Sequence, residues 1–263
     1  VVTEAQHQIH LFRKNECDIQ SGGGQEERDR DGHVLEKGKV LERLKRYEDA
    51  IESYSITLGL DDPTSFALLR IGKCYEKLRK DELALQFYNK CVEEDALLDK
   101  GWIAITDYYF RKKNYQKALY YIDKAIHIDS ENVLYWKRYA KINNHLNLYE
   151  EAEQGYRRAL ELGNYEQDTW LTRCDILIHL GEFNAAITNL FQAIEFYSES
   201  PEIEFRLAGL FFATNEERKG IFHLRNALKY DAEYVIVLEE LFPSVYENTQ
   251  VQEIIAQHKN PSV

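Results

Sequence analysis

The sequence predicts an all-α fold built from repeated pairs of helices. The spacing of small and large residues returns every 34 residues, which is typical of helical repeat proteins. Prolines are scarce, at 4 in 263 residues, so helices can run without interruption. In the stretch NYQKALYYIDKAIHID, residues 114–129, two alanines stand seven apart among Tyr and Ile, as expected where one helix lies close against another.

Six blocks align without an insertion: 31–64, 65–98, 99–132, 133–166, 167–200 and 201–234. The eighth position is always small, with Gly38, Gly72, Thr106, Ala140, Cys174 and Ala208. So is the twentieth, with Ala50, Ala84, Ala118, Ala152, Ala186 and Gly220. The twenty-seventh holds Thr57, Cys91, Ala125, Ala159, Ala193 and Ala227, whereas the twenty-fourth is large, with Tyr54, Tyr88, Ile122, Tyr156, Leu190 and Leu224.

Each block predicts two antiparallel helices, A and then B, which cannot bury both apolar faces alone. Stacking the next pair buries the remainder, and the small residues let helix axes approach within about 8–10 Å. After the sixth block, the stretch 235–263 predicts capping helices that shield the last apolar face, chiefly through Val235, Leu238, Leu241 and Phe242. Residues 1–30 lack the pattern, and their Gly-rich, charged stretch predicts a flexible or non-native segment.

The pattern resembles the tetratricopeptide repeat (TPR) over residues 31–234, with Trp102, Trp136 and Trp170 on its first aromatic position. The resemblance, closest to stand-alone bacterial TPR proteins, implies a right-handed α-solenoid of six helix pairs with a C-terminal capping helix. The family's closing Pro is absent, so Asp, Asn, Ser and Gly are expected to form these turns. Arg173 stands where the family prefers Leu, and we expect Asp175 or a neighbouring carboxylate to pair with it.

Composition restricts the partners. The formal net charge of −12 argues against nucleic acid, because phosphate binding needs a basic surface. No apolar run reaches the roughly 18 residues of a membrane span, so no membrane association is expected. The 4 Cys residues show no paired spacing, which favours reduced thiols and a cytoplasmic location.

No catalytic, metal or cofactor site is predicted. His7, His10 and Cys17 are a weak metal constellation because no fourth ligand is apparent. Asp175 and His179 have i, i+4 spacing that suits acid–base chemistry but is equally ordinary on a solvated helix. We therefore expect a protein that is not an enzyme.

The resemblance also implies that the A helices line a concave groove. Its candidate peptide-binding residues in this sequence are Lys39, Arg43, Lys73, Lys77, Asp107, Phe110, Arg111, Lys137, Lys141, Asp175, Ile178, His179, Phe205 and Phe212. Basic residues gather in the first four repeats and apolar ones in the last two. A matching ligand is a peptide with acidic residues at one end and bulky apolar residues at the other.

The expected function is a scaffold or adaptor that holds a peptide segment of another protein in this groove. The alternative is a structural module that self-associates through its end repeats. The Lys and Asn pattern of the two-carboxylate clamp, found in the chaperone-binding members of the family, is absent here, since Leu35 and Ile103 occupy positions in the corresponding helices.

Overall fold

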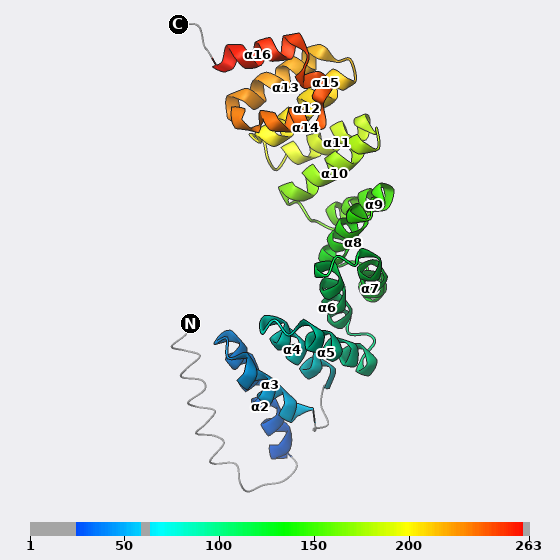
Figure 1. Cartoon of the computed structure of the whole chain (residues 1–263), viewed down its shortest axis with the longest axis vertical. Coiled ribbons are helices and arrows are strands. Elements are labelled where there is room, and N and C mark those ends of the chain that lie inside the picture. The colour runs from blue at the N-terminus through cyan, green and yellow to red at the C-terminus, as the bar shows by residue number, and fades with distance from the viewer. Residues whose placement is uncertain (1–24, 59–63, 260–263) are drawn as a thin grey trace. The chain divides into compact units, whose positions relative to one another are not determined.

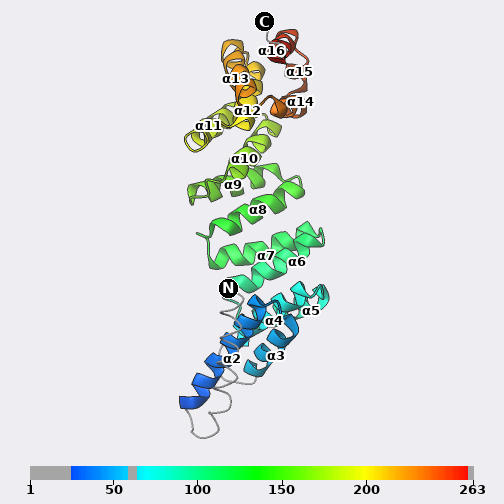
Figure 2. The same ribbon diagram turned by 90° about the vertical axis from the view of Figure 1, so that its left-hand side faces the viewer.

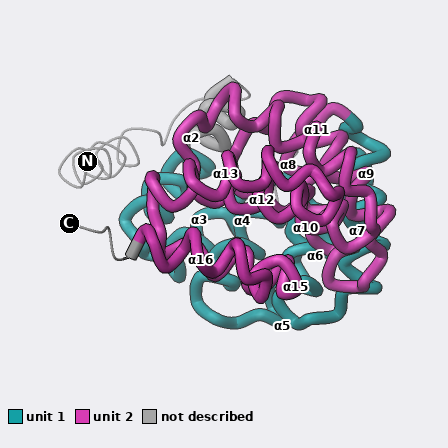
Figure 3. Tube along the Cα trace, turned by 90° about the horizontal axis from the view of Figure 1, so that it is seen from above, with its two compact units in different colours: residues 1–130 teal, residues 131–263 magenta. Residues whose placement is uncertain are grey.

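The computed structural model describes residues 25–58 and 64–259, and every regular element in these ranges is a helix (Figure 1). The chain divides into two compact units, residues 1–130 and 131–263, which are coloured separately in Figure 3. The boundary falls next to the end of the third predicted repeat, so each unit contains three helix pairs.

Unit 1 consists of three successive helical hairpins. Its helices are α2 (Gln25–Arg43), α3 (Tyr47–Thr57), α4 (Thr64–Lys77), α5 (Asp81–Glu94), α6 (Asp99–Arg111) and α7 (Tyr115–Ile128). Each A helix packs against the B helix that follows it, and each B helix packs against the next A helix. The predicted pairing of helices is therefore present in this unit.

Unit 2 repeats the arrangement and adds short helices at its end (Figure 2). Its elements are α8 (Val133–His145), α9 (Tyr149–Glu161), α10 (Gln167–His179), α11 (Phe183–Ile194), α12 (Pro201–Ala213), α13 (Glu217–Tyr230), the 3₁₀ helix η1 (Ala232–Val235), α14 (Ile236–Leu241), α15 (Pro243–Tyr246) and α16 (Thr249–Lys259). The all-α fold of consecutive helix pairs followed by a cap is confirmed.

The small residues lie where helices touch. Every member of the eighth, twentieth and twenty-seventh positions is buried, and so is every large residue at the twenty-fourth. A Cβ atom on Gly72 would lie 2.4 Å from Cε1 of Tyr88, and one on Gly38 would lie 2.4 Å from Cε1 of Tyr54. Small size at these positions is thus required by the ring of the partner helix.

The turn inside each hairpin has one residue in the left-handed backbone region, always at the fifteenth position of the block. These residues are Lys45, Arg79, Lys113, Asn147, Gly181 and Asn215, with φ between 57° and 75°. In the third repeat, the Lys113 N–H donates to the Phe110 carbonyl, and the next N–H reaches back to Tyr109. This closes the end of the A helix as a left-handed C-cap does.

The turns between hairpins use polar side chains in place of the missing Pro, as expected. The Asp95 carboxylate accepts from the Leu97 N–H at 2.9 Å, and Asp231 accepts from the Glu233 N–H at 2.9 Å. Asn164 accepts from the Glu166 N–H at 3.3 Å. Such local bonds stabilise a turn without fixing the backbone through a proline ring.

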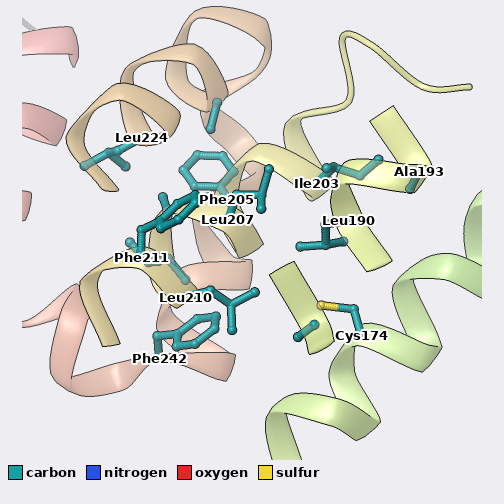
Figure 4. Close-up of a cluster of buried hydrophobic side chains, with 14 of the residues drawn as sticks. Cys174, Leu190, Ala193, Ile203, Phe205, Leu207, Leu210, Phe211, Leu224 and Phe242 are labelled. Atoms are coloured by element: carbon teal, nitrogen blue, oxygen red, sulfur yellow. The ribbon is translucent and has the colours of Figure 1, made fainter. Parts of the chain in front are cut away.

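The segment after α13 covers the last helix pair. Leu238 and Phe242 are buried, and a Cβ on Gly209 would lie 2.2 Å from Cδ2 of Phe242, so this ring rests directly on α12 (Figure 4). Val235 and Leu241 are partly buried against the same cluster. The four residues predicted to shield the end of the array pack against it.

One predicted boundary was wrong. Helix α2 begins at Gln25, so residues 25–30, which we assigned to a flexible or non-native segment, are helical. Gln, Glu and Arg are good helix formers, and they outweigh the lack of an apolar pattern in this stretch. His7, His10 and Cys17 lie outside the described residues.

Candidate peptide-binding groove

A cavity of about 450 Å³ opens among the A helices of unit 1. Lys73, Lys77 and Asp107, three of the predicted groove residues, line it. The other lining residues are Glu42, Tyr47, Arg70, Cys74, Glu76, Lys100, Ile103 and Ala104. Helices α2, α4 and α6 supply all of these except Tyr47, so the A helices form the walls.

Two carboxylates in this cavity have cationic partners. Glu42 Oε1 lies 3.2 Å from Arg70 Nε. Glu76 accepts from Arg111 Nη1 at 3.1 Å and from the Tyr88 hydroxyl at 2.8 Å. The charges of Glu42 and Glu76 are therefore largely compensated within the protein.

Three lysines in the same cavity have no such compensation. Within the described part of the chain, no carboxylate oxygen lies within 4.0 Å of the Nζ atom of Lys73, Lys77 or Lys100. Partial burial, followed by the nearby Arg70 guanidinium, lowers the pKa of Lys73. The cavity therefore presents cationic groups that an anionic ligand would stabilise.

The remaining basic candidates of unit 1 differ among themselves. Lys39 pairs with Glu36 at 2.6 Å and lies 5.5 Å from the centroid of the Phe66 ring. Arg43 is exposed. Arg111 is the partner of Glu76, and the half-buried Phe110 packs 5.4 Å from Tyr115 between ring centroids. None of these three cations lines the cavity.

In unit 2 the polar candidates are engaged with other residues. Lys137 forms an ion pair with Glu166, and Lys141 is an exposed residue that also interacts with other residues. Asp175 accepts two hydrogen bonds from Arg206, at 2.7 and 2.9 Å. Asp175 therefore does not form the acid–base pair with His179 that its spacing permits.

Of the two partners predicted for Arg173, Asp175 or a neighbouring carboxylate, the structure shows the second. Its guanidinium donates to Glu153 Oε1 at 2.7 and 3.0 Å and to Asn189 at 3.0 Å. A neighbouring carboxylate pairs with it, but this is Glu153 on α9 and not Asp175. The reason is that the Asp175 carboxylate already accepts two hydrogen bonds from Arg206 on the next A helix.

The prediction that Phe205 belongs to an apolar end of the groove was wrong. Phe205 is 0% exposed and lies among Leu207, Phe211 and Leu224, so it offers no surface to a ligand (Figure 4). All residues from Ile203 to Phe211 are buried, because α13 and α14 both pack on α12. Bulky side chains of this A helix therefore stabilise the fold.

The other three candidates of unit 2 are partly available. Ile178 and Phe212 are half-buried against the core, and a Cβ on Gly220 would lie 2.7 Å from the Phe212 ring. His179 is exposed, with its ring centroid 4.1 Å from that of Tyr149.

Sequence reasoning missed two cations of the cavity, Lys100 and Arg70. Lys100 is the second residue of its block, a position that the family pattern assigns to the groove, so this signal was present. Arg70 stands at the sixth position, which the pattern does not assign to the groove. In the structure it lines the cavity, with its guanidinium 3.2 Å from Glu42 and 5.7 Å from the centroid of the Phe66 ring.

Among the described residues, no group of three or more His, Cys, Asp or Glu side chains is placed to hold a metal ion. No described helix has the length and apolar character needed to cross a membrane.

Comparison with known proteins shows which sequences and folds this chain is similar to. The sequence model of the tetratricopeptide repeat matches residues 67–96, which span most of α4 and α5. No curated protein matches the chain.

Solved structures of similar fold include YrrB, a TPR protein with an unusual peptide-binding site, at 18% identity and a TM-score of 0.62. That match covers 72% of this chain and 98% of YrrB. The C-terminal part of a TPR protein from Cytophaga hutchinsonii matches at 17% identity and a TM-score of 0.70, over 95% of this chain and 94% of that one.

PilF of Pseudomonas aeruginosa matches at 14% identity and a TM-score of 0.57, over 86% of this chain and 97% of PilF. Identities this low establish the fold alone. The repeat pattern and the paired helices agree with these matches, so the chain has the fold of tetratricopeptide repeat proteins, and residues 67–96 match the sequence model of that repeat.

Proposed function

We propose that this protein is a non-catalytic interaction scaffold and that unit 1 binds an acidic peptide segment of another protein. The observation that carries the proposal is the cavity on the A helices, into which Lys73, Lys77 and Lys100 bring charges without carboxylate partners. YrrB, which has a similar fold, is a peptide-binding protein, and this supports the general role.

The ligand differs from the one that the sequence alone suggested. An acidic stretch still matches the groove of unit 1. The bulky apolar stretch loses one of its predicted binding residues, since Phe205 belongs to the core. We therefore propose a ligand whose recognition depends on carboxylates. In a chain of net charge −12, these lysines form a local exception that steers an acidic segment to the cavity.

Binding of a capped hexaglutamate peptide tests the proposal. We expect calorimetric titration to show binding that weakens with salt, because exposed charges are screened. The double variant Lys73→Glu/Lys77→Glu should lower the affinity at least tenfold. Its matched control, Lys117→Glu/Lys124→Glu, makes the same change in net charge at two exposed lysines of α7 and should retain the affinity.

Two outcomes would contradict the proposal. Equal loss in both double variants would show that only net charge matters. Absence of binding by the unmodified protein at low salt would show that the cavity does not accept a peptide carboxylate.

A further inference from the structure

The fourth and fifth repeats depart from the others at two facing positions. The twenty-first position is apolar in five repeats, with Ile51, Leu85, Leu119, Ile187 and Ile221, but is Glu153 in the fourth. The seventh position holds the fully buried residues Ile71, Ile105 and Leu207 in three repeats, Lys37 in the first, Tyr139 in the fourth and Arg173 in the fifth. Both departures meet at one helix junction, because Glu153 and Arg173 form an ion pair between α9 and α10.

This ion pair is well shielded from solvent. The side chains of Arg173 and Glu153 are only 14% and 13% exposed. Asn189 extends the network, accepting from Arg173 at 3.0 Å and donating to the Trp170 carbonyl at 2.9 Å. A buried ion pair is seldom more stabilising than the apolar pair it replaces. A gain in stability therefore does not explain why an ion pair stands where other repeats have apolar residues.

Arg173 and Asn189 lie in the wall of a second cavity, of about 600 Å³, in unit 2. It lies along the B helices α9 and α11, with α10 contributing Trp170 and Arg173. The full set of lining residues is Arg157, Leu160, Glu161, Tyr165, Trp170, Arg173, Ala185, Thr188, Asn189, Gln192, Glu195 and Phe196. This set includes none of the predicted groove residues, so the cavity is distinct from the A-helix groove.

One part of the cavity wall is aromatic. The rings of Tyr165 and Phe196 stack with centroids 4.7 Å apart and planes 12° apart, and Trp170 lies parallel to Phe196 at 6.4 Å. Tyr165 and Phe196 are 48% and 51% exposed. They offer flat apolar surface to a ligand.

The polar groups of the wall include unused donors. Trp170 is 4% exposed, and its indole Nε1–H has no acceptor among the described residues. Trp102 occupies the same repeat position in unit 1, and its Nε1–H donates to the Ala96 carbonyl at 2.9 Å. The exposed Gln192 amide also makes no hydrogen bond to another described residue. A ligand acceptor that reaches the Trp170 indole would therefore satisfy a buried donor that the described residues leave without a partner.

The formal charges of the wall balance, with Arg157 and Arg173 against Glu161 and Glu195. An ionic ligand of either sign has no general advantage here. Aromatic surface, surplus donors and zero net lining charge match an uncharged chain with flat rings and carbonyl acceptors. Proline has these properties, because its ring packs on aromatic side chains and its nitrogen carries no hydrogen to donate.

We propose that this cavity binds an uncharged, proline-rich segment of a partner protein, and that Glu153 holds the Arg173 side chain in the cavity wall. Because the cavity lies within unit 2, this site is independent of the acidic-peptide site of unit 1.

Titration with acetyl-decaproline amide, followed by NMR of the three indole N–H groups, tests the proposal on the full chain. The Trp170 resonance should move in a saturable manner, while those of Trp102 and Trp136 stay in place. Phe196→Ala should weaken binding at least tenfold. Phe222→Ala removes an aromatic ring that is 61% exposed on α13 and should leave the affinity unchanged.

The double variant Glu153→Leu/Arg173→Leu restores the apolar repeat pattern. It removes the Arg173 guanidinium, and with it the hydrogen bond to Asn189, from the cavity wall, and should lower the affinity at least tenfold, while its thermal unfolding midpoint stays equal or rises. Unchanged decaproline binding by this folded variant would overturn the proposal. So would the absence of a Trp170 shift in the unmodified protein, or displacement of decaproline by hexaglutamate from the same cavity.

Discussion

The contact between Gly72 and Tyr88 allows a direct test of the steric basis of the repeat. In Gly72→Ala, the new Cβ would lie 2.4 Å from Cε1 and 2.6 Å from Cδ1 of the Tyr88 ring. An ordinary contact begins at about 3.4 Å, so ring or helix must shift by about 1 Å. The ring has little freedom, because Tyr88 is 0% exposed and its hydroxyl donates to Glu76.

Two opposing effects set the magnitude. Overpacking a tight core costs about 1–3 kcal/mol. Replacing Gly by Ala inside a helix gains about 1 kcal/mol. We therefore expect Gly72→Ala to lower the free energy of unfolding by up to about 2 kcal/mol. The steric cost is thus expected to exceed the gain in helix propensity.

Other repeats of the chain show how the clash is relieved. The eighth and twenty-fourth positions hold Thr106 with Ile122 in the third repeat and Cys174 with Leu190 in the fifth. In these two repeats a larger residue at the eighth position is accompanied by a smaller one at the twenty-fourth. The fourth repeat combines Ala140 with Tyr156 and has a glycine, Gly155, where a Cβ would lie 2.8 Å from the Ala140 Cβ. Tyr88→Leu removes the two nearest of these contacts and leaves the Ala84 carbonyl, at 3.2 Å, so in that background Gly72→Ala should be neutral or stabilise by up to about 1 kcal/mol.

Urea unfolding of the four proteins of this double-mutant cycle, followed by circular dichroism, measures the coupling. We expect a coupling energy of about 1–3 kcal/mol. If Gly72→Ala is equally destabilising with Tyr and with Leu at position 88, the ring contact is not the reason for the glycine. The steric explanation of the repeat pattern would then be refuted at this position.

Two further predictions concern the turns and the buried thiols. Lys113→Gly should raise the free energy of unfolding by about 0.5–1 kcal/mol, since Lys113 has φ 57°, whereas Asn147→Gly should change little in the same urea assay because Asn tolerates this backbone region. Burial raises the pKa of the Cys74 thiol to about 12 and that of Cys91 to about 11. The unfolded chain, with thiol pKa values of about 8.5, loses these protons first, so stability should fall as pH rises from about 9 to 11. Cys91→Ala introduces the residue most common at its repeat position and should make the fall in stability with pH shallower. An identical pH dependence in this variant would show that the Cys91 thiol does not contribute to that fall.

The sequence predicts the helix junctions well, because steric fit between backbones depends on residue size alone. Ala118 and Ala152 are buried for the same reason in both units. The left-handed turn residues were not anticipated. Lys45, Arg79 and Lys113 are not typical of that backbone region, and only the other turns, with Asn147, Gly181 and Asn215, contain residues that favour it.

The error at Phe205 has a different origin. Its position in the block belongs to the groove, but the segment after α13 folds back on α12 and buries this helix on further sides. A repeat pattern describes an average repeat, and the last repeat has a neighbour that no other repeat has. Terminal repeats therefore need a separate argument about what covers them.

Side-chain pairing also limits what a list of groove positions can predict. Arg111 and Lys77 stand at the same position of successive A helices, the thirteenth of their blocks. Arg111 meets Glu76 on the preceding A helix, whereas the equivalent acid for Lys77, which is Glu42, pairs with Arg70. Position alone assigns the two cations the same role, but the choice of ion partner leaves only Lys77 available to a ligand. The charge that such a groove offers to a ligand therefore depends on which of its cations already form ion pairs with carboxylates of the protein.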